Sequence, residues 1–510
     1  MFALEFTCET RIGAALSSSM RATFVLLCTL AGIAPAVFAD AQIADAEFRQ
    51  RRDSLTARLP QDAVIIAFGE RDEIGFPAFY QSPNFRYLTG LSEPNAVLVI
   101  TGRDASGHSL GTLFRQDRAP SDILFNGPLE EPADVTRRTN LAVRPLAQLA
   151  PVVDSLIAAG RPLFTIRDTR PYGGTNDTLT RGSVFVAALR RRTPAPTILS
   201  ADSAILALRG RKSAAEELLV RRSAAITSQS VNNAIRSIRP GLHEYDVQAM
   251  LESGFRSGGG DSHPGFATNV SAGMNSTTAH HRADDAPLVA GKLVLMDVGA
   301  AYQGYSADVT RTVPVSGKFT PEQRDIYQLV RDAQASAERA ATLGAPGNGM
   351  GDSASATIAL GLARLGLIES PDATFDPPWA DRCARSPGQC RQSYFFYFHG
   401  VGHGIGLDVH DATQHSAGRG GGAPAGGIQP GDAFTIEPGI YIDARRIALL
   451  SDTPKNRAFI AKMRGVIAKY DGIGVRIEDD YMATPRGVER ITPAVREISE
   501  IEALMQPPRP

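Results

Sequence analysis

Three of the nine histidines in this 510-residue chain lie between His399 and His410, in the segment HGVGHGIGLDVHD. Imidazole groups at this density are typical of a metal or catalytic site. A helical HExxH zinc motif is excluded, because Gly400 follows the first histidine in place of the glutamate base. Glycines at the alternate positions from 400 to 406 would also cost a helix about 1 kcal/mol each.

A dinucleotide-binding loop is excluded as well. The pattern G-x-G-x-x-G would need glycine at position 405, 407 or 409, where the chain has Ile, Leu and Val. The segment is therefore predicted to be a loop or extended chain whose backbone lies close to a ligand or to another segment, which is where glycine is used. Taken alone, three unrelated histidines on a mobile loop are an equally good interpretation.

Four carboxylates favour the metal site. Asp297 in LVLMDVG and Glu437 in FTIEPG are lone acids in apolar runs, and burying such a charge is costly unless it is paired. Asp308 follows 11 residues after Asp297, where a hairpin could bring the two side by side, and Glu478 lies in GVRIEDD. Any one of these acids could be a structural carboxylate at a strand edge. Together with His403 they form an oxygen-rich set that suits two bridged divalent ions, with Mn²⁺ or Co²⁺ favoured over a lone Zn²⁺.

In their order and local settings, these residues closely resemble the pita-bread dinuclear metallopeptidases. The settings are MDVG, SADVTRT, HGVGHGIGLDVHD, TIEPGIY and VRIEDD. Within that family the chain is most similar to the Xaa-Pro aminopeptidases (aminopeptidase P), with the prolidases as nearest relatives. The resemblance covers nearly all of the chain after residue 41, because NFRYLTGLSEPNAVLVI is similar to the signature of the family's non-catalytic N-terminal domain.

The resemblance implies a role for each metal-binding position. Asp297 would bind one ion through both oxygens. Asp308 and Glu478 would bridge the two ions. His403 and Glu437 would complete the other ion, with Glu437 also placed to take a proton from the attacking water.

The resemblance also implies residues that handle the substrate. His280, in STTAHH, matches a substrate-binding histidine, and His399 and His410 match the catalytic histidines that hold the substrate and stabilise the reacting carbonyl. Arg476 matches an arginine at the rim of the site. His281 matches no assigned position, and we interpret it as a solvated neighbour.

The activity that follows from the resemblance is hydrolysis of the N-terminal Xaa-Pro bond of peptides by a hydroxide that bridges two divalent metal ions, with Mn²⁺ expected and Co²⁺ or Zn²⁺ as alternatives. The expected partners are peptides with proline at position two. A prolidase acting on Xaa-Pro dipeptides is the alternative, and it would need a cation or a closed wall for the proline carboxylate. A non-catalytic peptide-binding homologue is a third hypothesis. Relatives commonly form homodimers or homotetramers.

The elements that must position these residues can be read from the sequence. Alternating helical and strand-like segments predict an N-terminal α/β domain at residues 42–205. Two long helical runs followed by strand-like segments occur twice in residues 206–510, which suggests duplicated halves. The resulting fold class is an α/β N-terminal domain plus an α+β catalytic domain of the pita-bread type.

Composition excludes several classes of protein. Hydrophobic residues make up 43% and charged residues 21% of the chain, values that are typical of globular proteins. The formal net charge of −1 gives no reason to expect nucleic acid or an anionic membrane as partner.

Residues 1–41 are interpreted as a secretory signal peptide with some upstream residues. Arg21 precedes the apolar run ATFVLLCTLAGIAPAVF, and cleavage after Ala39 or Ala41 suits the small-residue rule. We expect an exported protein, periplasmic or secreted, without a stable membrane anchor; a retained anchor is the alternative.

The remaining cysteines, Cys383 and Cys390, have six residues between them in CARSPGQC, which predicts a small disulfide-closed loop in an oxidising compartment, with free thiols as the alternative. They belong to the first of three segments, 370–392, 416–427 and 443–470, by which the chain departs from compact relatives. These segments either shape the rim of the pocket or are surface insertions.

Overall fold

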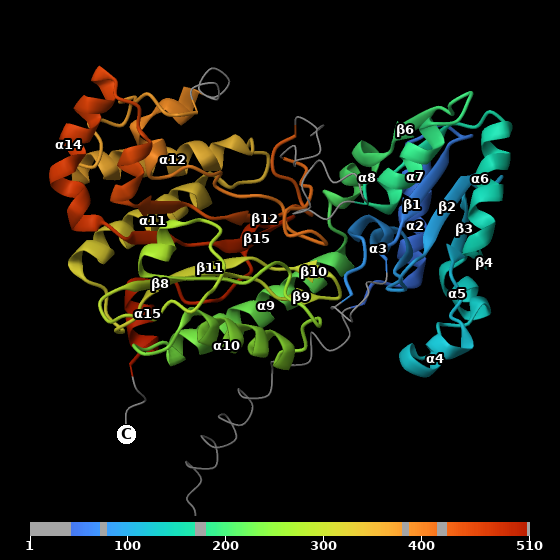
Figure 1. Ribbon diagram of the computed structural model, residues 1–510, viewed down its shortest axis with the longest axis horizontal. Helices are drawn as coiled ribbons and strands as arrows, with labels where there is room; N and C mark the ends of the chain where they lie inside the picture. The colour runs from blue at the N-terminus through green and yellow to red at the C-terminus, as the bar shows by residue number, and fades with distance from the viewer. Residues whose placement is uncertain (1–41, 72–78, 169–179, 380–386, 416–425, 507–510) are drawn as a thin grey trace, which may run out of the picture. The chain divides into compact units, whose positions relative to one another are not determined.

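The computed structural model describes residues 42–71, 79–168, 180–379, 387–415 and 426–506 (Figure 1). The predicted signal peptide, residues 1–41, lies outside the described residues. Residues from Ile43 onward belong to a single compact unit. Within the described residues, no helix has the length and apolar character needed to cross a membrane.

The N-terminal part is built on a six-stranded mixed sheet in the order β4-β3-β2-β1-β5-β6 (Figure 1). Its strands are β1 (Val64–Phe68), β2 (Val97–Arg103), β3 (Ser109–Arg115), β4 (Ala142–Pro145), β5 (Leu163–Thr165) and β6 (Ile198–Ser200). Its helices are α2 (Asp45–Thr56), α3 (Pro83–Thr89), α4 (Pro120–Asn126), α5 (Pro132–Thr139), α6 (Leu149–Ala158), α7 (Arg181–Arg190) and α8 (Asp202–Arg209).

The segment VIIAF is apolar throughout because it forms β1, a strand inside the sheet. It pairs antiparallel with β2 and parallel with β5, and all five of its residues are buried. Val64 and Ile66 pack with Val153 of α6, whereas the alternate residue Ile65 points to the opposite face of the sheet. A strand that is covered on both faces needs hydrophobic residues at every position.

The catalytic part begins with helices α9 (Ala214–Ser237) and α10 (Glu244–Ser257). The hydroxyl of Ser213 accepts from the amide of Glu216, whose carboxylate in turn accepts from the amide of Ser213, so this capping box sets the start of α9. A three-stranded antiparallel sheet follows, in the order β11-β8-β7. Its strands are β7 (Asn269–Ala272), β8 (Leu293–Val298) and β11 (Val309–Pro314), and the short pair β9 (Ala301–Tyr302) and β10 (Tyr305–Ser306) connects the last two.

Two helices followed by strands then occur a second time, as the sequence predicts. The helices are α11 (Pro321–Ala340) and α12 (Asn348–Leu365). The strands form two small sheets, β12 (Ala433–Ile436) with β15 (Asp479–Thr484) and β16 (Gly487–Arg490), and β13 (Gly439–Ile442) with β14 (Ile473–Arg476). The chain is completed by α14 (Pro454–Tyr470), between β13 and β14, and by α15 (Ile498–Leu504).

One large hydrophobic core joins both halves of the catalytic part. Ile226 of α9, Met296 of β8 and Val330 of α11 belong to the same buried cluster as Ile436 of β12. Each fully buried side chain of this size contributes about 1.5–3 kcal/mol through the area it removes from water. The core therefore holds the strands that carry the polar residues described below in fixed positions.

Three expectations about segments can be compared with the structure. The boundary between residues 205 and 206 stays a prediction, and it falls inside α8. The segment 443–470 contains α14, and the buried Phe459 and Met463 of that helix belong to the main core. Cys390 is disulfide-bonded, but Cys383 lies outside the described residues, so the pairing of the two stays a prediction.

Candidate active site

The four predicted carboxylates converge from the ends of strands. Asp297 is the fifth residue of β8, and Asp308 precedes β11 by one residue. In the ladder between these strands Asp297 lies opposite Thr310, so the hairpin brings the two aspartates together as predicted. Glu437 lies in the break between β12 and β13, and Glu478 lies in the break between β14 and β15.

His403 lies at the centre of this group. Its Nε2 atom is 3.5 Å from Asp308 Oδ2, 3.5 Å from Glu437 Oε1 and 3.8 Å from Glu478 Oε1. Ligand atoms of Asp308, His403 and Glu478 lie within 4.8 Å of one another, close enough to share an ion. The Nδ1 atom of His403 is 3.0 Å from the carbonyl oxygen of Gly404, which fixes the tautomer that leaves Nε2 without a proton.

Two buried carboxylate oxygens in this group have no hydrogen-bond partner within the part of the chain that the structure describes. They are Asp308 Oδ1 and Glu478 Oε1. A buried charged oxygen without a donor costs several kcal/mol, roughly 1–3 for the missing hydrogen bond alone. The orphaned oxygens, together with an unprotonated imidazole nitrogen, fit divalent metal ions as the missing partners.

The electrostatics of the metal-free site lead to the same conclusion. Burial, followed by repulsion from Glu478, raises the pKa of Asp308 well above its usual value. Burial and repulsion from Glu478 raise the pKa of Glu437 to about 8, while burial and repulsion from Asp297 raise that of Glu478 to about 7. Carboxyl groups this close together cannot all ionise unless cations compensate them.

The glycines of the histidine segment are explained by close backbone approach. The segment is irregular, but it follows β12 through hydrogen bonds from Thr435 N to His403 O (2.8 Å) and from Glu437 N to Val401 O (2.6 Å). A Cβ atom at Gly402 would lie 2.0 Å from the carbonyl oxygen of Thr435, and one at Gly404 would lie 2.3 Å from that of Asp411. Glycine is therefore required here, and the prediction of a backbone pressed against another segment is confirmed.

A relay of hydrogen bonds links His399 to Asp297. Tyr441, which the sequence did not single out, donates through its hydroxyl to His399 Nε2 (2.9 Å) and accepts from Arg476 Nη1 (2.6 Å). The other side of the Arg476 guanidinium forms a very short ion pair with Asp297 Oδ2. His399 Nδ1 donates to the carbonyl oxygen of Gly400 (2.8 Å). Burial, with Arg476 nearby, lowers the pKa of His399 to about 3, so this histidine is neutral at physiological pH.

The expectation that Arg476 lies at the rim of the site is wrong. Its exposure is 3%, and it belongs to β14, whose four residues are all buried. The reason is pairing, because Asp297, Glu478 and the Tyr441 hydroxyl surround the guanidinium and offset the cost of burying it.

His410 and His280 occupy different surroundings. The ring centroid of His410 lies 4.0 Å from that of His403, so the two imidazoles are in contact. His280 is exposed and lines the same pocket as the metal-site carboxylates. Both positions suit residues that meet a substrate, as predicted.

His281 is not the solvated neighbour that we expected. Its side chain is only 16% exposed, and its Nε2 atom is 2.7 Å from Glu244 Oε2. Glu244 is fully buried at the start of α10 and also accepts from the backbone amides of Ala272 (2.5 Å) and Asp284 (3.0 Å). The pair anchors the loop that presents His280. Nothing in the local sequence indicates this, since the two partners are 37 residues apart.

A second buried cluster holds the loop that ends in His410. Arg209 Nη2 lies 2.6 Å from Asp408 Oδ2 and 2.8 Å from Asp411 Oδ1, on either side of that histidine. The same guanidinium donates to Asn84 Oδ1 of the N-terminal part (2.7 Å). The side chain of Arg209 therefore connects α3 to the loop that ends in His410.

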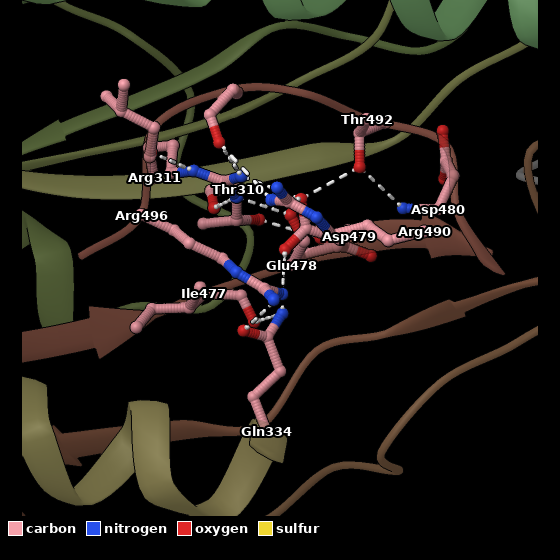
Figure 2. A network of polar contacts seen from close by, with 12 residues as sticks. Thr310, Arg311, Gln334, Ile477, Glu478, Asp479, Asp480, Arg490, Thr492 and Arg496 are labelled. Carbon is pink, nitrogen blue, oxygen red and sulfur yellow. Dashed lines mark hydrogen bonds and ion pairs between the residues drawn. The ribbon is translucent and has the colours of Figure 1, made fainter. Parts of the chain in front are cut away.

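Behind Glu478, the next residue Asp479 is the centre of a buried network (Figure 2). Asp479 Oδ1 accepts from Arg311 (2.7 Å) and from the hydroxyl of Thr492 (2.8 Å), while Oδ2 accepts from Arg496 (3.0 Å). Although burial alone would raise it, the arginines hold the pKa of Asp479 below its usual value. Asp479 is thus a structural anion, not a metal ligand.

Arg311 and Asp480 connect this network to the backbone of two predicted metal ligands. Arg311 donates to the carbonyl oxygens of Glu478 (2.6 Å), Ala494 (2.9 Å) and Val495 (2.6 Å). The carboxylate of Asp480 accepts from the backbone amide of Asp308 (3.1 and 3.2 Å). Both contacts fix the backbone of a predicted metal ligand.

A cavity of about 1330 Å³ opens in front of these residues. Its lining includes the five predicted ligands and the histidines at 280, 399 and 410. Among the described residues, none from the segments 370–392 and 443–470 lines it. The described residues of those two segments therefore do not shape the pocket, while residues 380–386 of the first and most of the segment 416–427 lie outside the described residues.

Comparison with known proteins gives a consistent result. Residues 219–485 match metallopeptidase family M24, and residues 48–164 match the aminopeptidase P N-terminal domain. The Xaa-Pro aminopeptidase of Haemophilus influenzae is 30% identical over 479 residues, which cover 91% of this chain and 98% of that protein. The solved structure of aminopeptidase PepP of Pseudomonas aeruginosa is 31% identical, with a TM-score of 0.73 and coverage of 91% and 99%. Aminopeptidase P from Escherichia coli, solved with the inhibitor Pro-Leu, is 26% identical, with a TM-score of 0.72 and coverage of 91% and 98%.

Proposed function

The chain belongs to metallopeptidase family M24, and on that premise we propose that it removes the N-terminal residue from peptides whose second residue is proline, in a reaction that depends on divalent metal ions. The observation that carries this proposal is the cluster around His403, in which buried carboxylate oxygens lack any hydrogen-bond partner among the described residues. The Xaa-Pro aminopeptidases to which the chain is similar over most of its length support the same activity.

Two divalent ions would be held by Asp297, Asp308, His403, Glu437 and Glu478. We propose Mn²⁺ as the native metal, with Co²⁺ or Zn²⁺ as alternatives, because hard oxygen ligands dominate the set. Bound there, the ions would acidify a water molecule and polarise the scissile carbonyl.

The protein's own residues handle the protons. Glu437 lies 3.5 Å from His403 Nε2 and 3.7 Å from His399 Nδ1, at the floor of the pocket. Burial and repulsion from Glu478 raise its pKa to about 8, and divalent cations bound beside it would favour the ionised form. As a carboxylate it would accept a proton from the attacking water and return it to the leaving nitrogen.

The histidines orient the substrate. His399 is neutral, and both of its ring nitrogens have partners. Its Nδ1 atom therefore contacts a substrate by giving up its hydrogen bond to the Gly400 carbonyl oxygen. His410 and His280 reach the pocket from other loops. The nitrogen of proline lacks a proton in the peptide, so the leaving group must be protonated and recognised by ring shape, not by a backbone donor.

The test is hydrolysis of Ala-Pro-Ala, Ala-Pro and Ala-Ala-Ala by protein lacking residues 1–41, after metal removal and again with Mn²⁺ restored. We expect Mn²⁺-dependent release of alanine from Ala-Pro-Ala, with Ala-Pro cleaved more slowly and Ala-Ala-Ala left intact. Preference for Ala-Pro would support the prolidase alternative. No cleavage of any peptide by metal-loaded protein would leave the binding-protein hypothesis.

A matched variant makes this test specific. Glu437→Gln keeps the shape of the side chain but removes the proton acceptor, so we expect loss of turnover in a protein that still folds. The control is Asp443→Asn. It should retain activity, because among the described residues the carboxylate of Asp443 is bonded only to Arg445.

Two further proposals concern the state of the protein in the cell. We propose export after removal of residues 1–41, which the mass of the protein in a periplasmic or culture fraction would test. We also propose a homodimer or homotetramer, which light scattering during gel filtration would test. A full-length cytoplasmic product or a monomer would contradict the respective proposal.

A further inference from the structure

The pocket has a second wall, which the N-terminal part contributes. At about 1330 Å³ its volume exceeds the roughly 300–1,000 Å³ of usual small-molecule sites, so it has room for more than a dipeptide. Three arginines from this part of the chain line it, Arg71, Arg86 of α3 and Arg181 at the first position of α7, and so do the acids Glu70 and Asp168.

Arg86 reaches from the N-terminal part to the catalytic part. Its guanidinium group lies over Gly304 and is 3.4 Å from the hydroxyl of Ser92. The nearby acid is Asp261, but both of its oxygens accept from the backbone amides of Gln303 (2.9 Å) and Gly304 (2.7 Å). The charge of Arg86 is therefore not neutralised by a bonded carboxylate.

Among the described residues, the hydrogen-bond partners of Arg181 are neutral groups. It donates to the carbonyl oxygens of Gly69 (2.7 Å), Ala96 (3.1 Å) and Asn95 (3.2 Å). Asp168 lies nearby, but its carboxylate accepts from the amide of Gly182 (2.6 Å). The three carbonyl contacts hold the guanidinium in place without balancing its charge.

Buried arginines of this protein have two kinds of partner. Among the described residues Arg52, like Arg181, donates only to carbonyl oxygens, those of Leu88 and Thr139. Arg209 and Arg311 each have an aspartate within 2.7 Å. Among the residues that the structure describes, neither Arg86 nor Arg181 has a carboxylate oxygen at ion-pair distance. Burial accordingly lowers the pKa of both. A partly buried cation without a counter-ion is costly, and an anionic ligand in the pocket would remove that cost.

We propose that Arg86 and Arg181 form an anion subsite that binds a carboxylate of the peptide substrate on the C-terminal side of the proline. This inference rests on the proposed function, which places the free amine and the scissile bond at the metal ligands. Two divalent ions there would balance the four carboxylates of Asp297, Asp308, Glu437 and Glu478. In the N-terminal part, Glu70 and Asp168 offset part of the charge of Arg181 without pairing with it.

The shared chemistry is a carboxylate, and it has two sources in a peptide. One is the C-terminal carboxylate of a short peptide, and the other is the side chain of Asp or Glu. In the first case the enzyme favours short peptides, because each extended residue moves the terminal carboxylate roughly 3.3–3.6 Å further along the pocket. In the second case it favours acidic peptides over neutral ones. Guanidinium groups suit this role because they bind carboxylates through parallel hydrogen bonds.

The experiment compares peptides that differ only in charge, using the Mn²⁺-loaded protein. Ala-Pro-Ala-Ala is compared with its C-terminal amide, and Ala-Pro-Ala-Glu amide with Ala-Pro-Ala-Gln amide, at low and at moderate salt. We expect KM to be about tenfold lower for at least one charged peptide than for its neutral match, and the ratio to shrink with added salt. The pair that shows the ratio identifies the source of the carboxylate.

Variants test whether the arginines cause the ratio. Arg86→Gln and Arg181→Gln should each bring the ratio toward one, and Arg181→Lys should retain part of it. Arg137→Gln is the matched control, because that arginine has a 76% exposed side chain outside the pocket and its loss changes net charge equally. It should leave the ratio unchanged.

The outcomes separate this proposal from the proposed function. No cleavage of any peptide would refute the proposed function itself. Cleavage with equal KM for charged and neutral peptides would refute only the subsite. If Arg181→Gln weakens both kinds of peptide equally, the arginine serves only to join β1 and β2, and the subsite proposal is overturned.

Discussion

Removing the metal should make the stability of this protein fall as pH rises from 5 to 8. In the metal-free site, burial and mutual repulsion raise the pKa of Glu437 to about 8 and that of Glu478 to about 7, whereas glutamate in an unfolded chain ionises near 4.5. The folded state therefore holds protons that the unfolded state has already released. Stability from such groups is complete below the unfolded-state pKa and is lost as pH rises through the folded-state pKa.

The size of the effect follows from the same values. For Glu437 alone, a rise from 4.5 to about 8 corresponds to about 5 kcal/mol if it is fully expressed as stability. The two glutamates share their repulsion, and Arg476 compensates part of it. We therefore expect the free energy of unfolding of the metal-free protein to fall by about 2–3 kcal/mol between pH 5 and pH 8.

Urea denaturation of metal-free and Mn²⁺-loaded protein at pH 5, 6.5 and 8 measures this directly. The loaded protein should show a much smaller decrease, and Glu437→Gln should reduce the slope of the metal-free protein. Calorimetry of Mn²⁺ binding at pH 7 in two buffers of different ionisation enthalpy should report release of about one proton or more per protein. Metal-free protein that is equally stable, or more stable, at pH 8 than at pH 5 would refute the reasoning.

Three other substitutions test the contacts around the site. Tyr441→Phe removes the hydroxyl that orients His399, so kcat on Ala-Pro-Ala should fall about 10–100-fold at unchanged metal content, and an unchanged kcat would contradict the relay. His281→Ala leaves its buried glutamate partner short of a donor and should destabilise the protein by about 1–3 kcal/mol in urea denaturation, with a negligible change arguing against the anchor. Arg209→Met removes the ion pair of Asp408 and leaves Asp411 with Lys212 as its remaining cation, so it should cost about 3–5 kcal/mol, part of which a second substitution, Asp408→Asn, should restore.

The cluster of carboxylates around His403 could be predicted from short motifs in the sequence. Asp297 and Glu437 are recognisable as lone acids within strand-like runs, and the glycines around His403 exclude a helix. The structure adds that Glu437 and Glu478 lie in breaks between strands, where a carboxylate can leave the ladder and point into the pocket. The order of the elements that carry these residues, two helices followed by strands and then the same again, was also predicted.

The residues that the sequence did not reveal are those whose role depends on a distant partner. Tyr441 acts through Arg476, 35 residues away, and Arg209 acts through Asp408, 199 residues away. Local pattern carries no information about such pairs. Arg476 was misplaced at the rim for the same reason, since its burial depends on Asp297 from another strand.

The contacts of Arg311 have a consequence for the order in which the protein matures. The last predicted ligand is Glu478, but the side chain that holds its carbonyl group is itself held by the carbonyl groups of Ala494 and Val495. A nascent chain that has been synthesised only as far as the five predicted ligands therefore still lacks the residues that hold Arg311 in place. A protein shortened by about 20 residues would keep all five predicted ligands but lose Ala494 and Val495, and we expect it to bind divalent metal ions more weakly than the full chain.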